Sequence, residues 1–315
     1  MSKAVAVVTG GAGFIGSHLA GRLDADGCSV RVIDDLSTGD PANLTALGPA
    51  VDVVEGSVLD RRVLDETLRG ARFVFHQAAV PSVGRSMANP LRTHEANVTG
   101  TISLLEAARE AGVERVVYAS SSSVYGGAHP LPVREDLEPR PVSPYAVSKL
   151  SGEYYCRCYF ASYGLPTVSL RYFNVFGPRQ SFTSDYAAVI PRFARALLRN
   201  EPLTVYGDGD QSRDFTYIDN VVEANLLAAS APDPALGRVF NVASGTRFSL
   251  NDVVRMLTEL TGAEDADVRF AEPRPGDVRH SQADISAATS TLGYSVVVPF
   301  EDGLKLTLDW VDSQV

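Results

Sequence analysis

Short apolar, β-rich runs alternate with helical stretches in the first half of the chain. Predicted strands lie at 4–9, 29–34, 51–54, 71–76, 115–120 and 167–171, and predicted helices at 14–26, 60–69, 90–111 and 144–163. This alternation is typical of βαβ units, which build a parallel sheet covered by helices on both faces. The run at 116–120 is nearly all apolar, as expected of a strand buried on both sides.

The alternation loosens after about residue 172. Helices are predicted near 186–199, 219–230, 249–261 and 301–312, and strands near 203–206, 238–242 and 267–271. Loops rich in Gly, Pro and charge lie between them, without a flexible linker. The pattern predicts an α/β protein with a doubly wound parallel sheet over 1–172 and a smaller α/β substrate-binding region over 173–315. The boundary is soft, and segments of the two regions can interleave.

The composition narrows the classes of function. The 315 residues carry a net charge of −10, so no global basic field attracts nucleic acid, and an anionic ligand needs a local site. The 3 Cys lack Cys or His partners at zinc spacing, so no metal site is predicted. No apolar run approaches the ~20 residues of a membrane span, and the first apolar run ends in glycines instead of a signal-peptide pattern. We expect a cytoplasmic protein without a membrane partner.

A glycine-rich loop follows the first predicted strand. Its glycines are Gly10, Gly13 and Gly16, which suit a tight turn, close approach to a pyrophosphate and close packing of helix on sheet. The helix that follows directs its partial positive charge at phosphates. Asp34 lies 18 residues beyond Gly16, at the end of the second strand. A carboxylate there binds the ribose hydroxyls of NAD and repels the 2′-phosphate of NADP, so the predicted cofactor is NAD.

Two further patterns concern catalysis. Tyr145 and Lys149 are four residues apart on a predicted helix that starts at Pro144, so they share one face. The ammonium is expected to lower the tyrosine pKa and to make the phenol a general base. On its own such a pair is more often an exposed surface pair. The serine run 120–123 follows the fifth strand, where ligands of parallel sheets bind, and its hydroxyls can orient a sugar hydroxyl toward Tyr145.

These features, in this order, resemble the extended short-chain dehydrogenase/reductase superfamily, which implies a Rossmann-like sheet. Within it the chain is most similar to the UDP-glucose 4-epimerase and UDP-N-acetylglucosamine 4-epimerase family. The resemblance extends over nearly the whole chain and includes the stretches 76–79, 97–101, 170–180, 207–215 and 276–284.

The resemblance implies roles for individual residues. The catalytic set is Ser121, Tyr145 and Lys149. The NAD-binding set is Gly10, Gly13, Phe14, Ile15, Gly16, Asp34, Ser57, Val58, Ala78, Ala79, Asn97, Ser120, Tyr145, Lys149 and Phe173. The set that holds the UDP-sugar is Ser82, Ser122, Asn174, Ala188, Arg213, Arg274, Asp277 and Ser281. Two positions depart from the family pattern: Ser57 stands where an acid often contacts adenine, and Pro81 stands where the acetamido branch often has a glycine.

The implied reaction is NAD-dependent 4-epimerisation of a UDP-hexose through a transient 4-keto sugar. Dehydratases of this scaffold carry Asp-Glu in place of Ser122-Ser123, and related decarboxylases carry a Glu in this loop, so the serines favour simple epimerisation. A UDP-uronate 4-epimerase, another nucleotide-sugar epimerase or dehydratase, and a silent NAD-binding regulator stay open. The small Ser281 occupies a gate position beside the sugar's C2 substituent, which implies that acetamido sugars are accepted. The family also implies a homodimer through the helices near 97–111 and 145–163.

Overall fold

The computed structural model describes residues 4–45, 47–127, 129–181, 188–263, 265–273 and 278–315. Its centre is a seven-stranded sheet in which every neighbouring pair of strands is parallel. The strands lie in the order β11 (Arg238–Val242), β6 (Thr167–Tyr172), β5 (Arg115–Ser121), β4 (Phe73–His76), β1 (Val5–Thr9), β2 (Ser29–Asp34) and β3 (Asp52–Glu55). The predicted α/β class and doubly wound parallel sheet are therefore confirmed.

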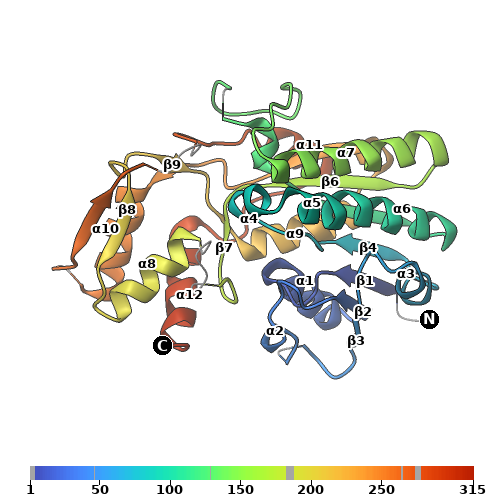
Figure 1. Ribbon diagram of the computed structural model, residues 1–315, viewed down its shortest axis with the longest axis horizontal. Coiled ribbons are helices and arrows are strands. Elements are labelled where there is room, and N and C mark those ends of the chain that lie inside the picture. The colour runs from blue at the N-terminus through green and yellow to red at the C-terminus, as the bar shows by residue number, and fades with distance from the viewer. Residues whose placement is uncertain (1–3, 46, 128, 182–187, 264, 274–277) are drawn as a thin grey trace.

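Alternate residues of the strands enter two different cores. Ala6 and Val8 pack with α1 (Phe14–Ala25), α9 (Ile218–Ala229) and α11 (Ser286–Leu292) on one face of the sheet. Val7 packs with α3 (Arg61–Thr67), α6 (Gly100–Glu110) and α7 (Pro144–Tyr163) on the other. Figure 1 shows α6 and α7 on the opposite side of the sheet from α1. Both faces of the strands are thus covered, as their continuous apolar runs predict.

A smaller group of elements lies beside the sheet (Figure 1). Its helices are α8 (Val189–Leu198), α10 (Leu250–Thr261) and α12 (Phe300–Asp312). Its short strands pair as β8 (Leu203–Tyr206) with β13 (Val268–Ala271), β9 (Ser212–Arg213) with β12 (Phe248–Ser249), and β7 (Val175–Phe176) with β10 (Thr216–Tyr217).

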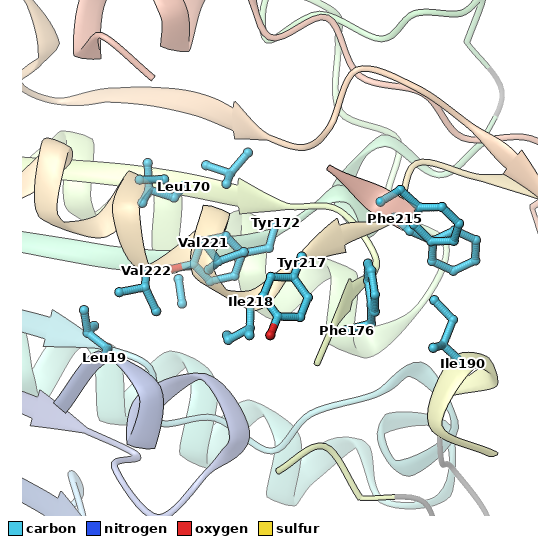
Figure 2. Close-up of a cluster of buried hydrophobic side chains, with 14 of the residues drawn as sticks. Leu19, Leu170, Tyr172, Phe176, Ile190, Phe215, Tyr217, Ile218, Val221 and Val222 are labelled. Atoms are coloured by element: carbon cyan, nitrogen blue, oxygen red, sulfur yellow. The ribbon is translucent and has the colours of Figure 1, made fainter. Parts of the chain in front are cut away.

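One buried cluster joins the sheet to these outer elements. It extends from Leu19 and Leu170 beside the sheet to Phe176, Phe215 and Ile190, as Figure 2 shows. Aromatic rings fill its outer end, where the ring centroids of Phe176 and Phe215 lie 5.4 Å and 5.5 Å from that of Phe300. The two parts of the chain therefore share a core.

The sequence boundary at residue 172 stays a prediction, because the two regions interleave. Strand β11 and helix α9 come from beyond it, and both contribute to the sheet layer. The single helix predicted at 90–111 is instead α5 (Pro90–His94), a π-helical turn over Glu95–Thr99, and α6. Short elements without a sequence prediction include α2 (Ala42–Thr45), α4 (Val83–Ala88), α11, the two-residue strands β7, β9, β10 and β12, and 3-10 turns over Ser122–Tyr125 and Asp233–Ala235. Within the described part of the chain, no helix combines the length and apolar character of a membrane span.

Candidate active site

The glycine loop connects β1 to the first turn of α1. Gly10 has a φ of +71°, a conformation that suits glycine. A Cβ at Gly16 would lie 2.1 Å from the Gly10 carbonyl oxygen, so only glycine allows the helix to start this close to the strand. Gly13 is the N-cap residue, and no side chain caps the helix. The first N–H groups of α1 are thus available to an anion.

Asp34 ends β2 beside this loop. Its two carboxylate oxygens accept hydrogen bonds from the backbone N–H groups of Ala12 and Leu36, each at 2.9 Å. Burial raises the pKa of the Asp34 carboxyl, although these hydrogen bonds oppose the shift. The carboxylate is therefore held rigidly where the second strand of the motif ends.

A cavity of about 770 Å³ lies over the carboxyl ends of β1, β2, β4 and β5. Its size falls within the usual range for cofactor sites. Most of the predicted NAD-binding residues line it, namely Gly10, Gly13, Phe14, Ile15, Gly16, Asp34, Ser57, Val58, Ala78, Ala79, Ser120, Tyr145 and Lys149. The predicted substrate residue Ser82 lines the same cavity. The uncapped helix start, the glycine cradle and the fixed carboxylate fit a dinucleotide.

Two predicted cofactor residues lie away from this cavity wall. Asn97 is buried, and its side chain is hydrogen-bonded to both backbone groups of Val80 and to the Ser148 hydroxyl. Phe173 is 1% exposed, and its ring centroid lies 6.1 Å from that of Tyr125. Both side chains support neighbouring segments of the site, and their direct contact with NAD stays a prediction.

Tyr145 and Lys149 lie on the first turns of α7. The helix starts with Ser143 as N-cap, whose hydroxyl accepts a hydrogen bond from the Ala146 N–H. The Lys149 ammonium lies 6.0 Å from the Tyr145 ring centroid and donates a 2.8 Å hydrogen bond to the Ala119 carbonyl. Burial lowers the pKa of Lys149 to about 8. Tyr145 and Lys149 therefore share one face of α7, close to the end of β5, as predicted.

The expected lowering of the tyrosine pKa is wrong for the chain alone. Burial raises the pKa of Tyr145, and a side-chain hydrogen bond with Ser121 opposes this shift only in part. In the chain alone, burial therefore disfavours the phenolate form of Tyr145.

The serine run forms a turn at the end of β5. The Ser121 hydroxyl accepts a hydrogen bond from the Ser123 N–H at 3.2 Å and bonds the Tyr145 side chain. Ser120 donates to the carboxylate of Glu153. Glu153 is in turn paired with Arg171 at 2.7 Å inside the core. A ligand beside Tyr145 would therefore meet serine hydroxyl groups at this turn.

A second cavity of about 230 Å³ lies between β7, α8 and the loops around β9. Asn174, Ala188 and Arg213 line it, and Ala188 also lines the first cavity. The Asn174 amide donates to the Asp214 carbonyl at 3.0 Å and to the Ser281 hydroxyl at 3.2 Å. Ser281 and Ser122 belong to neither wall as described, and Arg274 and Asp277 lie outside the described residues.

Comparisons with known proteins agree with this geometry. A model of the NAD dependent epimerase/dehydratase family matches residues 6–243. The chain belongs to this family. A UDP-glucose 4-epimerase of Mycolicibacterium smegmatis is 38% identical over 311 residues, which cover 96% of this chain and 97% of the relative.

Solved structures of the same group are similar over the whole chain. A UDP-N-acetylglucosamine 4-epimerase from Methanobrevibacter ruminantium M1, in complex with UDP-N-acetylmuramic acid, has a TM-score of 0.93 and 39% identity, with 100% of both chains covered. A UDP-glucuronic acid 4-epimerase from Bacillus cereus, in complex with UDP-glucuronic acid and NAD, has a TM-score of 0.91 and 35% identity, with 99% of this chain and 100% of that chain covered. The predicted family, the NAD cofactor and an isomerase of the UDP-sugar epimerase group are confirmed.

Several residues of this epimerase/dehydratase family member line the cavities without having been predicted. Arg179, Gln180, Trp310 and Gln314 line the first cavity, and Arg192 and Tyr206 line the second. Arg179 and Gln180 stand in a stretch that carries the resemblance, so the sequence held a signal for them. Trp310 and Gln314 come from the end of α12 and beyond it, and no local pattern marks them.

Proposed function

We propose that this protein interconverts the C4 epimers of a UDP-hexose, with UDP-GlcNAc/UDP-GalNAc and UDP-Glc/UDP-Gal as its substrates. The observation that carries the proposal is that Tyr145 and Lys149 line the dinucleotide-sized cavity, while Ser121 is hydrogen-bonded to the Tyr145 side chain. A silent NAD-binding regulator has no need of this set of three side chains.

The chain's own residues supply binding, orientation and proton transfer. The residues that line the first cavity would hold NAD, which would supply the acceptance of a hydride from C4 of the sugar and its return. In its phenolate form, Tyr145 takes the proton of the sugar 4-hydroxyl, becomes a neutral phenol, and gives the proton back when the hydroxyl is restored. Ser121, already bonded to Tyr145, orients that hydroxyl. We assign to the Lys149 ammonium, 6.0 Å from the Tyr145 ring centroid, the role of stabilising the phenolate in the ligand-bound enzyme, against the effect of burial in the chain alone. Between the two hydride transfers, the 4-keto sugar turns to present its other face.

The serine turn supports epimerisation over dehydration or decarboxylation. Those reactions need a proton carrier near C5 or C6, and the turn presents hydroxyl groups from Ser121 and Ser122. Glu153, the carboxylate next to the turn, is only 3% exposed and holds Arg171 and Ser120. It is therefore engaged in the core. A UDP-uronate 4-epimerase needs no such acid, and the similarity to the Bacillus cereus enzyme makes it the second candidate.

Ser281 is proposed to set the size of the accepted sugar. It is partly buried, and its hydroxyl accepts hydrogen bonds from the Asn174 amide and, at 3.4 Å, from the Asp214 N–H. Its hydrogen-bond partner Asn174 lines the second cavity, so we expect an aromatic ring at position 281 to take up space beside that cavity. A steric clash excludes a ligand more strongly than a missing contact does.

A substrate panel tests the proposal. The purified protein is incubated with each of the two UDP-hexose pairs and with UDP-glucuronate, without added NADH, and the epimers are separated by chromatography. We expect both hexose pairs to react, the acetamido pair at least as well as the plain pair. Tyr145→Phe is the inactive control. Conversion of UDP-glucuronate alone would instead support the second candidate, and conversion of no sugar would refute both.

The gate is tested by two variants of the same residue. Ser281→Tyr should abolish the acetamido reaction and spare the plain hexose reaction. Ser281→Ala removes the same hydroxyl without adding volume, so it should keep both reactions. Equal loss of the acetamido reaction in the two variants would mean that the hydroxyl, not the volume, matters.

We also propose that the protein is a cytoplasmic homodimer. The helices predicted for this contact are α6 and α7, which pack against each other, and α7 exposes Val147 (49%), Tyr154 (57%) and Tyr163 (59%). A second copy placed by a two-fold axis would cover these side chains with the same ones. Light scattering should give twice the 33.7 kDa chain mass, and a value of one chain mass would contradict the dimer.

A further inference from the structure

The segment after β7 brings a cation to the cofactor cavity. Arg179 follows Gly177 and Pro178, and it lines the first cavity together with Gly13, Phe14 and Ile15. The backbone of Arg179 has a φ of 65°, which is uncommon for a residue other than glycine and often marks a functional position. The turn is held in place by a 2.9 Å hydrogen bond between the His18 ring and the Pro178 carbonyl.

This hydrogen bond fixes Arg179 against the start of α1. His18 lies one helical turn after Phe14, and their rings make an edge contact with centroids 5.8 Å apart. The Arg179 guanidinium is close enough to contribute to the lowered pKa of His18, about 4, which results mainly from burial. The charge of Arg179 thus lies near the uncapped N-terminus of α1.

One nitrogen of this guanidinium lacks a hydrogen-bond partner among the described residues. Its Nη1 atom is buried, and it makes no hydrogen bond to any residue that the structure describes. A buried donor without a partner is costly, so such a group is commonly satisfied by a ligand or water. The cations that line the same cavity are Arg85, Lys149 and Arg179. Lys149 belongs to the catalytic end.

We propose that Arg179 binds the diphosphate of NAD from the side opposite the α1 N-terminus. A guanidinium matches two phosphate oxygens with a planar pair of N–H donors, which suits a diphosphate held between a helix start and a loop. The nucleotide sugar also carries a diphosphate, so the two sources must be told apart. The position of Arg179 beside His18 and Phe14 assigns it to the dinucleotide.

Direct binding measurements on the full-length chain test this assignment without turnover. Trp310 is the single Trp and lines the same cavity, so its fluorescence reports NAD binding, with calorimetry as an independent readout. Arg179→Gln shortens the side chain only modestly but removes the charge and the fork. We expect a 10- to 100-fold larger Kd for NAD, as for the loss of a charge-assisted hydrogen bond. The Kd for ADP-ribose, which keeps the diphosphate, should increase by the same factor, whereas the Kd for adenosine should not change.

Matched variants separate diphosphate binding from a general effect of charge or folding. Arg134→Gln removes an exposed arginine of the same charge and should leave every Kd within twofold. Arg179→Lys keeps the positive charge but lacks the paired N–H donors of the guanidinium, so it should give an intermediate increase in the Kd for NAD. This variant also tests the proposal if Arg179→Gln does not fold. The Kd of UDP for the NAD-loaded protein should stay within twofold in both Arg179 variants. An unchanged Kd for NAD, or a loss confined to UDP, would overturn the proposal, whichever UDP-sugar the enzyme converts.

Discussion

The ion pair of Glu153 and Arg171 ties the catalytic helix to the sheet. Two hydrogen bonds join them, from Arg171 Nε to one Glu153 carboxylate oxygen at 2.8 Å and from Nη2 to the other at 2.7 Å. Their side chains are only 3% and 4% exposed. Glu153 belongs to α7, which carries Tyr145 and Lys149, and Arg171 belongs to β6. The pair therefore positions the helix on which the proposed chemistry depends.

Removal of one partner should lower the free energy of unfolding strongly. Glu153→Ala leaves a guanidinium buried without its carboxylate, and Arg171 cannot escape the cost by losing its proton. Breaking a buried pair in this way typically costs about 3–5 kcal/mol, a large share of a typical unfolding free energy of about 5–15 kcal/mol. Arg171→Met should cost less at low pH, because the abandoned Glu153 carboxyl can bind a proton.

The measurement is urea unfolding of each variant, evaluated by linear extrapolation. A double variant, Glu153→Leu with Arg171→Met, removes both charges and should cost several kcal/mol less than the sum of the two single losses. The exposed pair Arg255–Glu259, at 3.0 Å, is the control, and Glu259→Ala should cost about 0.5 kcal/mol or less. The positioning role of the pair would be refuted if Glu153→Ala and Arg171→Met lowered the free energy of unfolding as little as this control. It would also be refuted if the double variant lost the sum of the two single losses.

Two further predictions concern the cofactor and pH. Asp34→Asn should lower the affinity for NAD and raise the affinity for NADP, each by about tenfold, because the carboxylate repels a 2′-phosphate. Titration of the cofactor-free protein with both dinucleotides checks this. Equal affinity of the wild-type protein for NAD and NADP would contradict it. Burial holds the pKa of Lys149 at about 8, below its ordinary 10.5. Between these two pH values the unfolded chain therefore binds more protons than the folded chain. The contribution of Lys149 to the free energy of unfolding should rise with pH in this range, by at most about 1.4 kcal/mol per pH unit. Lys149→Met should lose this rise in pH-dependent unfolding curves, and kcat of the wild type should fall above pH 8 as the ammonium is lost.

The sequence predicts the local elements of the sheet more readily than their partners. The runs that form β1, β4 and β5 have largely continuous apolar patterns, and these strands and β2 lie within a residue or two of the predicted bounds. Strand β11 is predicted as an element, but the sequence places it in the second region. Nothing local in 238–242 distinguishes a partner of β6 from a strand of a separate small sheet, because the pairing is set by the crossover between them.

Side-chain surroundings are the second limit. Phe173 stands in a stretch that resembles the family pattern, yet its ring faces Tyr125 in the core, and spacing alone does not show which way a ring points. Likewise, the spacing of Tyr145 and Lys149 predicts their shared face but not the balance of burial against charge. The structure shows why burial prevails at the tyrosine: the ammonium is 6.0 Å from the ring centroid and bound to a carbonyl.

The cavity explains why the remaining site residues come from distant parts of the chain. A doubly wound sheet places its ligand beyond the carboxyl ends of the strands, and the first region alone supplies the floor of that space. The opposite wall comes from Arg179 after β7, from Ala188 before α8 and from Trp310 on α12. These positions are far apart in sequence, and the shared core around Phe176, Phe215 and Phe300 brings their elements together. A ligand in the cavity therefore contacts both parts of the chain, so changes in the packing of the outer helices are expected to alter NAD affinity as well as stability.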